Sequence, residues 1–549
     1  MFPRRTALAP AGATADHLVH DPDAPARVRP SLDGGFGPRA AVAFFGVLAL
    51  ALFFVAYSIY NDVNESGTRA TTALPFVLLG VALLVALGFE FVNGFHDTAN
   101  AVATVIYTHS LPPHIAVLWS GMFNFLGVLI SSGAVAFGII SLLPVELILK
   151  AGSQTGFAMV FALLIGAIVW NLGTWYLGLP ASSSHTLIGS IIGVGLMNQL
   201  MASGGGTSGV DWGQASKVGY SLLLSPVIGF TAAALLLLVA KKVARSPELY
   251  AEPRSDAPPP LWMRGLLILT CTSVSFAHGS NDGQKGMGLI MLILIGVVPT
   301  AYALNRAMPD SAIQPFLATS TQVAVVLDHY GQPATVGDPR EEIGTYLHTQ
   351  TLTPAVVPSV ATLVRDIQGQ VARYGSLRRL PAETVQNVRN DMYLADETLH
   401  RLERDNALAL TPANAQVLQS YRGMLERATR FIPTWVKIAV AIALGLGTMV
   451  GWKRIVITVG EKIGKTHLTY AQGASAELVA AATIAAADTY GLPVSTTHVL
   501  SSGVAGTMAA NRSGLQGRTL RSLLMAWVLT MPAAIVLSGG LFWLFMKTF

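Results

Sequence analysis

The sequence predicts an all-α polytopic membrane protein with about 10–12 transmembrane helices in two inverted repeats, some of them broken or re-entrant, and a helical extramembrane insert. Three observations lead to this prediction. Of the 549 residues, 52% are hydrophobic and only 12% are charged, whereas soluble domains carry about 25% charged residues. Apolar runs long enough to cross a bilayer recur along the chain. Two polar motifs each occur twice within these runs.

The chain divides into segments by composition. Residues 1–40 are rich in Ala, Pro, Asp and Arg and are expected to form a disordered N-terminal tail rather than a cleavable signal. The apolar segment 41–60 is predicted to be an additional transmembrane helix. The predicted remainder comprises transmembrane repeat 1 (72–241), a cytoplasmic linker (242–261), transmembrane repeat 2 (262–303 and 432–549), and a helical insert (304–431).

Two apolar runs, 72–108 and 262–303, are long for a single crossing of about 20 residues. Both carry the first polar motif. Backbone groups freed from a helix at membrane depth must face protein or a water-filled cavity. These two runs are therefore expected to form broken or re-entrant helices around a binding site.

Basic residues gather in short loops, which predicts the orientation of the chain. Examples are Lys241 and Lys242, Lys453 and Arg454, and Arg512. If each of the two long runs makes one net crossing, all these loops fall on one side, which should be the cytoplasm. The N-terminus is then cytoplasmic, and the protein is expected in the inner (plasma) membrane of a bacterium. Because the formal charge of +5 is explained in this way, nucleic-acid binding is not expected.

The insert 304–431 differs from the rest of the sequence. It contains twelve Arg and no Lys, with apolar residues at helical spacing. The count of crossings places it on the periplasmic side. The single cysteine, Cys271, lies in an apolar run and excludes an intrachain disulfide and a cysteine-based metal site.

The first polar motif places charged and amide side chains deep in apolar sequence, where one charge costs at least about 2.5–3.5 kcal/mol. It recurs around residues 275–288, with Gly279 and Asp282 in the places of Gly94 and Asp97. The polar residues of the two copies are Glu90, Asn93, His96, Asp97 and Asn100, and Asn281, Asp282, Gln284 and Lys285. The motif predicts a substrate or ion site. The alternative is polar side chains bonded between packed helices.

The second motif pair indicates two homologous halves. The residues Gly-Leu-Pro-Ala-Ser-Ser-Ser-His at 178–185 recur as Gly-Leu-Pro-Val-Ser-Thr-Thr-His at 491–498. His185 and His498 are 313 residues apart and Asp97 and Asp282 are 185 apart; the difference of 128 equals the length of the insert. The predicted crossings give the halves opposite orientations, the inverted repeat of secondary transporters, whose sites lie near the midplane.

A proline followed by hydroxyl residues is typical of a helix start, and a helix start within the membrane offers N–H groups and a positive dipole end to an oxyanion. The alternative role is helix packing. The predicted neutral donors are Ser182, Ser183, Ser184, Thr186, Ser495, Thr496 and Thr497.

The acidic residues need a separate explanation because Asp97 and Asp282 would repel an anion. They either bind a co-transported cation or accept hydrogen bonds from a protonated oxyanion. Lys285 offsets the acidic charge or contacts substrate. His185 and His498 relay protons or act as structural donors. The residues predicted for cation or proton coupling are Glu90, Asn93, His96, Asp97, His185, Asp282 and His498.

These motifs resemble those of the inorganic phosphate transporter (PiT) family, whose duplicated signature is similar to residues 94–101 and 279–286 and whose proline–hydroxyl–histidine elements are similar to 180–185 and 493–498. The resemblance covers about residues 72–303 and 432–549. At positions 96 and 285 the sequence departs from the general signature. The residues there, His96 and Lys285, resemble those of the bacterial low-affinity phosphate permeases. That branch implies proton-driven symport of neutral metal–phosphate complexes, phosphate held between the two halves, and a homodimer.

The predicted function is a secondary active transporter that imports inorganic phosphate, as a metal–phosphate complex, by proton symport. It is not expected to be an enzyme or to hold a cofactor, and the sequence has no Walker loop for ATP. A magnesium or calcium ion carried with phosphate is expected near Asp97 and Asp282. The alternatives are sodium-coupled phosphate or sulfate symport, an uncoupled anion pathway, and a receptor or assembly protein acting through the insert.

Overall fold

The computed structural model describes residues 30–32, 37–66, 74–97, 99–142, 153–201, 210–253 and 256–548. These residues fold into helices joined by loops. They form no strand, and one isolated β-bridge joins Gly464 and Leu515. The all-α prediction is therefore confirmed. The predicted disordered tail lies mostly outside the described residues, which exclude 1–29 and 33–36.

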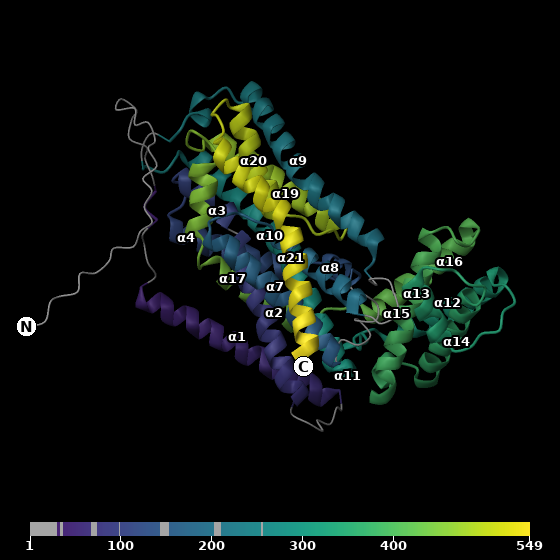
Figure 1. Ribbon diagram of the computed structural model, residues 1–549. Helices are drawn as coiled ribbons and strands as arrows, with labels where there is room; N and C mark the ends of the chain where they lie inside the picture. Colours follow the sequence, from purple (N-terminus) through teal and green to yellow (C-terminus); the bar gives the residue numbers. More distant parts are fainter. Residues whose placement is uncertain are drawn as a thin grey trace, which may run out of the picture.

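The helices before the insert begin with a long apolar helix that lies along the edge of the helix bundle (Figure 1). They are α1 (Pro38–Glu65), α2 (Leu74–Asp97), α3 (Ala99–Tyr107), α4 (Pro113–Ile130), α5 (Ala134–Ile140), α7 (Gln154–Tyr176), α8 (Ser183–Met201), α9 (Trp212–Val243), the 3₁₀ turn η1 (Pro247–Tyr250), α10 (Leu261–Val297) and α11 (Pro299–Tyr302).

The insert and the helices after it complete the chain. The insert contains η2 (Asp310–Ala312), α12 (Ile313–Tyr330), α13 (Pro339–Thr349), α14 (Val356–Tyr374), η3 (Leu377–Arg379), α15 (Ala382–Arg404) and α16 (Pro412–Thr429). After it come α17 (Thr434–Thr448), α18 (Lys453–Ile457), the π-helical turn η4 (Thr458–Lys462), α19 (Tyr470–Thr489), α20 (Thr496–Ala510) and α21 (Gly517–Thr548).

Within the described residues, six helices are long and apolar enough to cross a membrane, or seven if α16 and α17, bent by 71°, count as one span. The six are Pro38–Glu65, Leu74–Tyr107, Pro113–Ile130, Gln154–Tyr176, Trp212–Val243 and Gly517–Thr548. The chain is thus a multi-pass membrane protein. The predicted number is higher because it also counts short helices, such as the 15-residue α20, and α10, whose middle is polar.

The run 262–303 is not broken as predicted. Helix α10 is continuous over 37 residues, about 55 Å at 1.5 Å per residue. Its polar side chains find partners on neighbouring helices, so its backbone keeps its own hydrogen bonds. A break does occur elsewhere, because α7 ends at Tyr176 and α8 begins only at Ser183. The junction of α2 and α3 at Thr98 lies outside the described residues.

Helices from the two halves of the chain pack against each other rather than forming separate bundles. Helix α8 packs along α21, α9 along α20, α10 along α4, and α17 along α2. Figure 1 shows α19, α20 and α21 lying among helices of the first half. This pairing brings both copies of each motif into one core. The inverted symmetry of the halves stays a prediction.

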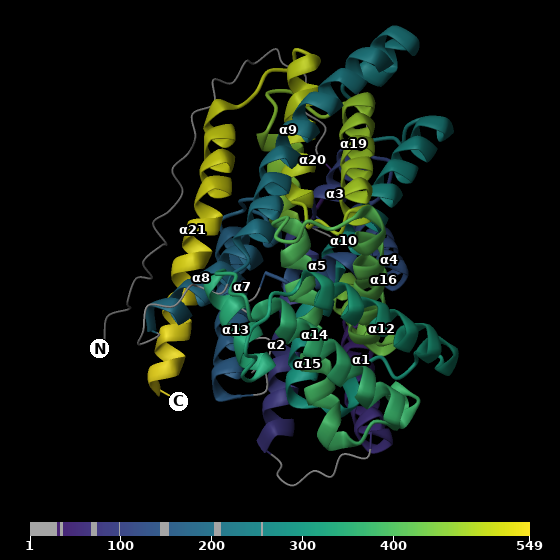
Figure 2. The same ribbon diagram turned by 90° about the vertical axis from the view of Figure 1, so that its right-hand side faces the viewer.

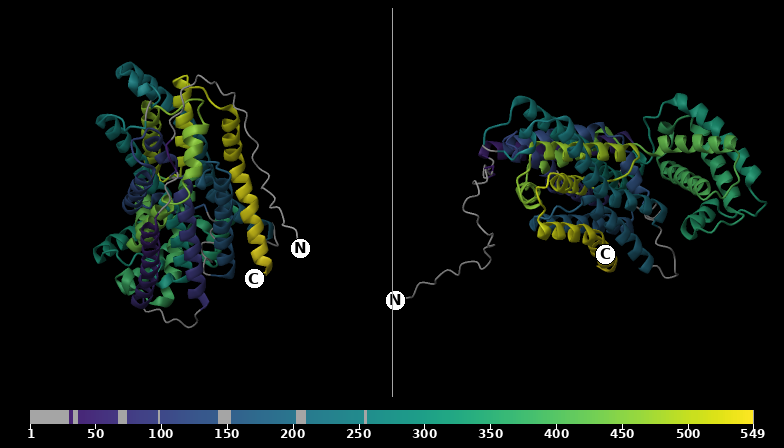
Figure 3. Two further views of the ribbon diagram at one scale, coloured as in Figure 1. Left: turned by 90° about the vertical axis from the view of Figure 1, so that its left-hand side faces the viewer. Right: turned by 90° about the horizontal axis from the view of Figure 1, so that it is seen from above.

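The insert folds as a separate helical body beside the bundle, as Figures 2 and 3 show. Its own core includes Leu363 and Tyr421. The two ends of the insert are fixed to α1, because Tyr302 Oη and Trp435 Nε1 donate to Asp62 Oδ2 at 2.7 and 2.9 Å. The additional N-terminal helix therefore contacts both segments that connect the insert to the membrane-spanning helices.

Glycines of the first motif allow helices from opposite halves to approach closely. A Cβ atom at Gly279 of α10 would lie 2.1 Å from the Asn124 carbonyl oxygen of α4. A Cβ atom at Gly94 of α2 would lie 2.3 Å from the Leu444 carbonyl oxygen of α17. Small residues at helix crossings serve membrane bundles in this way.

We expect Gly279→Ala to destabilise the protein by about 1–3 kcal/mol because backbone atoms of α4 must move. Gly265→Ala is the matched control on the same helix, since no atom lies within 4 Å of its added Cβ. Thermal unfolding of the purified protein in detergent, followed by size-exclusion chromatography, measures both. Equal melting temperatures for the two variants would contradict this account of the α4–α10 contact.

Candidate functional site

Asp97, the last residue of α2, is held by both helix starts of the second motif. Ser183 Oγ at the start of α8 donates to Asp97 Oδ2 at 2.5 Å, and Thr497 Oγ1 at the start of α20 donates to Asp97 Oδ1 at 2.7 Å. His96 Nδ1 lies 2.9 Å from the same Oδ1. The Asp97 side chain is almost completely buried. Residues 400 positions apart in the sequence thus meet at one carboxylate.

Lys285 connects this carboxylate to its counterpart on α10. Its Nζ lies 2.7 Å from Asp282 Oδ2 and donates to Ser183 Oγ at 3.2 Å. The Asp282 and Lys285 side chains are both completely buried. An ion pair in such surroundings stabilises only if its charges are well compensated, so the chain Asp282–Lys285–Ser183–Asp97 acts as one electrostatic unit.

His278 lies one helical turn before Asp282 and completes a cluster with metal-ligand geometry. Its Nε2 is 3.3 Å from Asp282 Oδ2, and its Nδ1 is 2.9 Å from Asn124 Oδ1. Ligand atoms of Asp97, His278 and Asp282 all lie within 4.8 Å of one another. Two carboxylates and an imidazole can hold a divalent cation, and the Asn124 contact orients the imidazole as ligating histidines require.

The helix starts follow the prolines at a short distance. Pro180 and Pro493 lie in the loops before α8 and α20. The caps are Ser182 and Ser495, whose side chains accept from the N–H groups of His185 and His498 at 3.2 and 3.1 Å. The prolines therefore lie within the preceding loops, and the serines cap the helices.

The other predicted hydroxyls are not equally available to a ligand. Ser184 Oγ donates to the Val494 carbonyl oxygen at 2.7 Å, which ties the two helix starts together. Thr186 Oγ1 donates to Asn171 Oδ1 at 2.9 Å. Thr496 Oγ1 is buried without a hydrogen-bond partner in the described part of the chain. Thr496 is therefore the donor of this group that a bound oxyanion would satisfy.

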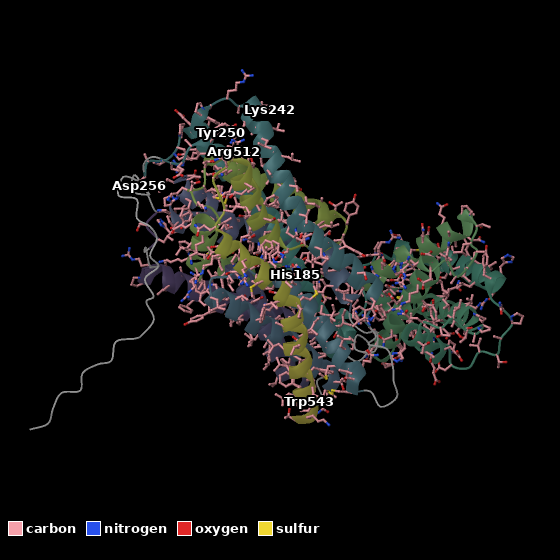
Figure 4. The ribbon with its side chains drawn as sticks, turned by 45° about the horizontal axis from the view of Figure 1, so that its top comes forward. His185, Lys242, Tyr250, Asp256, Arg512 and Trp543 are labelled. Atoms are coloured by element: carbon pink, nitrogen blue, oxygen red, sulfur yellow. The ribbon has the colours of Figure 1, made fainter. Side chains whose placement is uncertain are left out.

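His185 and His498 lie side by side, with ring centroids 4.6 Å apart, and His498 stacks on Trp527 at 4.2 Å. Among the described residues, His185 Nδ1 and His498 Nε2 find no hydrogen-bond partner. Figure 4 shows His185 within the bundle, between the end that carries Lys242 and Arg512 and the end that carries Trp543. Whether the pair relays protons, as the sequence analysis suggests, stays a prediction.

The remaining predicted residues surround this centre. Glu90 and Asn93 form a hydrogen bond of 3.4 Å, and the Glu90 side chain packs where a Cβ at Gly286 would lie. Asn281 contacts the loop before α20, since its Nδ2 donates to the Leu492 carbonyl oxygen at 3.2 Å. The side chain of Asn100 lies outside the described residues. Asn281 thus shapes the α20 start rather than facing the carboxylates.

Sequence reasoning missed three polar partners. His278 stands within the second copy of the first motif, and its four-residue spacing from Asp282 puts both on one helix face. Thr174 Oγ1 lies 3.1 Å from His96 Nε2. Asp488 accepts from Ser280 Oγ and Gln284 Nε2 at 2.7 and 2.6 Å. No sequence signal marks Thr174 or Asp488, because each comes from a distant helix.

The comparisons with known proteins bear on this site. The model of the phosphate transporter family matches residues 93–538, which include both copies of both motifs except Glu90. The chain belongs to the phosphate transporter family. As a family member it is a transporter and not an enzyme, and the family resemblance seen in the sequence is confirmed.

Individual relatives agree. The chain is 40% identical over 499 residues to the low-affinity inorganic phosphate transporter PitB of Escherichia coli (strain K12), covering 85% of this chain and 96% of that protein. It is 42% identical over 493 residues to PitA of the same organism, with the same coverage. A solved sodium-dependent phosphate transporter is 19% identical, with a TM-score of 0.47, over 86% of this chain and 100% of that one.

We expect Asp97→Asn and Asp282→Asn each to lower phosphate uptake at least about tenfold, the effect of losing one charge-assisted hydrogen bond at a buried site. Asp97→Asn removes the negative charge to which the Ser183 and Thr497 hydroxyls donate hydrogen bonds. Uptake of labelled phosphate into vesicles, normalised to inserted protein, measures the effect. Near wild-type uptake by both variants would show that these carboxylates are not part of the transport site.

Proposed function

We propose that this phosphate transporter family member imports inorganic phosphate across a bacterial inner membrane by proton symport, with phosphate carried as a neutral complex of magnesium or calcium. The observation that supports this proposal most is the position of cation ligands beside oxyanion donors. Asp97, His278 and Asp282 form the first group, and Lys285 with the helix-start hydroxyls forms the second.

A metal–phosphate pair matches the charges of both groups. The carboxylates attract a divalent cation, whose preferred ligands are oxygen atoms. Lys285, Thr496 and the N–H groups at the starts of α8 and α20 attract the phosphate. The complex crosses without net negative charge, and carrying a charge through the low-dielectric membrane interior costs several kcal/mol.

Protons are proposed as the coupling ion rather than sodium. Lys285 Nζ lies 2.7 Å from Asp282 Oδ2, so its ammonium group repels any cation bound at this carboxylate. A magnesium or calcium ion paired with phosphate brings a compensating anion with it, whereas a separately bound sodium ion does not. A proton can instead be carried on the phosphate or on an imidazole. The partner-free nitrogens of His185 and His498 offer such positions. Sodium-coupled symport and sulfate as substrate are the outcomes to be tested against this proposal, and a homodimer stays a prediction.

The test is uptake of labelled phosphate into vesicles that contain the purified full chain, with the proton gradient, sodium and magnesium varied independently. We expect an inward proton gradient and magnesium or calcium each to raise uptake, and replacement of sodium by choline to have no effect. Lys285→Asn should lose part of the proton dependence because the repulsion of sodium is removed. Uptake that requires sodium and ignores a proton uncoupler would overturn the coupling proposal.

We also propose that the N-terminus is cytoplasmic and the insert periplasmic. Lys242 and Arg512 lie at one end of the bundle (Figure 4), as expected for a cytoplasmic surface. The insert lies toward the other end, where α21 finishes (Figure 2).

Cysteines test this orientation after Cys271 is replaced. A cysteine at Arg379, an exposed position in the insert, should react with an impermeant thiol reagent added outside intact spheroplasts. A cysteine at Lys242, also exposed, should react only after the membrane is opened. The reverse labelling pattern would invert the proposed topology.

A further inference from the structure

A cavity of about 830 Å³ lies at the end of the bundle that we propose to be cytoplasmic. It is lined by the first turns of α1 and α4, the last turn of α7, and the turn between α17 and α18. The transport site described above does not use it. Its lining includes Trp175, Lys453 and Arg454.

The lining combines apolar and basic side chains. Ile115, Leu118 and Val450 contribute exposed apolar side chains. Lys453 and Arg454 contribute two positive charges, and none of the described residues that line the cavity is acidic. Such a surface fits a ligand with an anionic head and a hydrocarbon body.

Arg454 keeps donors available for an anion. Its Nη1 donates to the Tyr176 carbonyl oxygen at 2.7 Å, and its Cζ lies 5.4 Å from the Trp175 ring centroid. A guanidinium group has five N–H donors, so one hydrogen bond leaves four. The side chain is exposed, and the contacts with Tyr176 and Trp175 hold it at the cavity.

From these observations we propose that the cavity binds an anionic phospholipid of the cytoplasmic leaflet, with its phosphate against Lys453 and Arg454 and an acyl chain against Leu118. A lipid fits better than free phosphate because its acyl chain would pack against the apolar side chains of the lining, whereas free phosphate has no apolar group to do so. The site is separate from the one proposed for transport.

The proposed lipid would support the transport site through neighbouring residues of α7. Trp175 lines the cavity, whereas Thr174, the preceding residue, contacts His96. Trp175 also packs against Phe95, with ring centroids 5.3 Å apart, and its Nε1 donates to the Gly451 carbonyl oxygen at 2.7 Å. The cavity lining is thus adjacent in sequence to the residue that contacts His96.

The experiment uses the full chain in detergent with added phosphatidylglycerol, and native mass spectrometry counts the lipids that stay bound. Leu118→Trp fills the cavity without changing charge. Met122→Trp is the matched control, because Met122 is an exposed residue of the same helix outside the cavity. We expect Leu118→Trp to lose one bound lipid and Met122→Trp to keep the wild-type number.

A second pair of variants tests the charges. Lys453→Gln with Arg454→Gln should weaken phosphatidylglycerol binding at least about tenfold. The control, Lys241→Gln with Lys242→Gln, removes two charges outside the cavity lining and should bind like wild type. Phosphatidylcholine should not replace the bound lipid, and excess inorganic phosphate should not displace it. Displacement by phosphate, or equal binding by all variants, would overturn the proposal.

A photoreactive phosphatidylglycerol locates the site in membranes. Labelled peptides should contain residues 114–118 or 449–454. Labelling confined to peptides elsewhere in the chain would overturn the proposal. Since binding is measured without transport, this result is independent of the substrate and coupling ion.

Discussion

The protein depends on the compensation of buried charge around Asp97, Asp282 and Lys285. Three charged side chains without contact to water are tolerated only where hydrogen bonds and opposite charges surround them. The hydroxyls of Ser183 and Thr497 supply the hydrogen bonds, and Lys285 supplies the opposite charge. Because these partners come from α8, α20 and α10, the cluster requires both halves of the chain to meet at one point.

That requirement explains the packing of the bundle. Glycines at positions 94 and 279 bring α2 and α10 against helices of the opposite half at backbone contact distance. The caps formed by Ser182 and Ser495 allow α8 and α20 to start inside the protein. The insert and α1 stand outside this arrangement, joined to it at Asp62. Family membership favours transport, rather than an activity of the insert, as the main function.

The charge balance also relates the site to its ligand. Asp97 and Asp282 against Lys285 leave the centre short of positive charge when its histidines are neutral, which favours binding of a cation together with phosphate. His278 joins the two carboxylates in one group of potential cation ligands. The residues whose burial costs most are therefore also the ones that would hold the proposed metal–phosphate pair.

The sequence by itself determined the all-α membrane fold, the paired motifs and the positions of Asp97, Asp282 and Lys285 within them, because composition and spacing are local properties. It did not determine the continuity of α10, since whether polar side chains break a helix depends on partners elsewhere. Nor could it show that Ser183 and Thr497 bind the same carboxylate, that Ser184 and Thr186 are already engaged, or that His278 joins the two aspartates. Those contacts link residues up to 400 positions apart, and only the packing of helices fixes such distances.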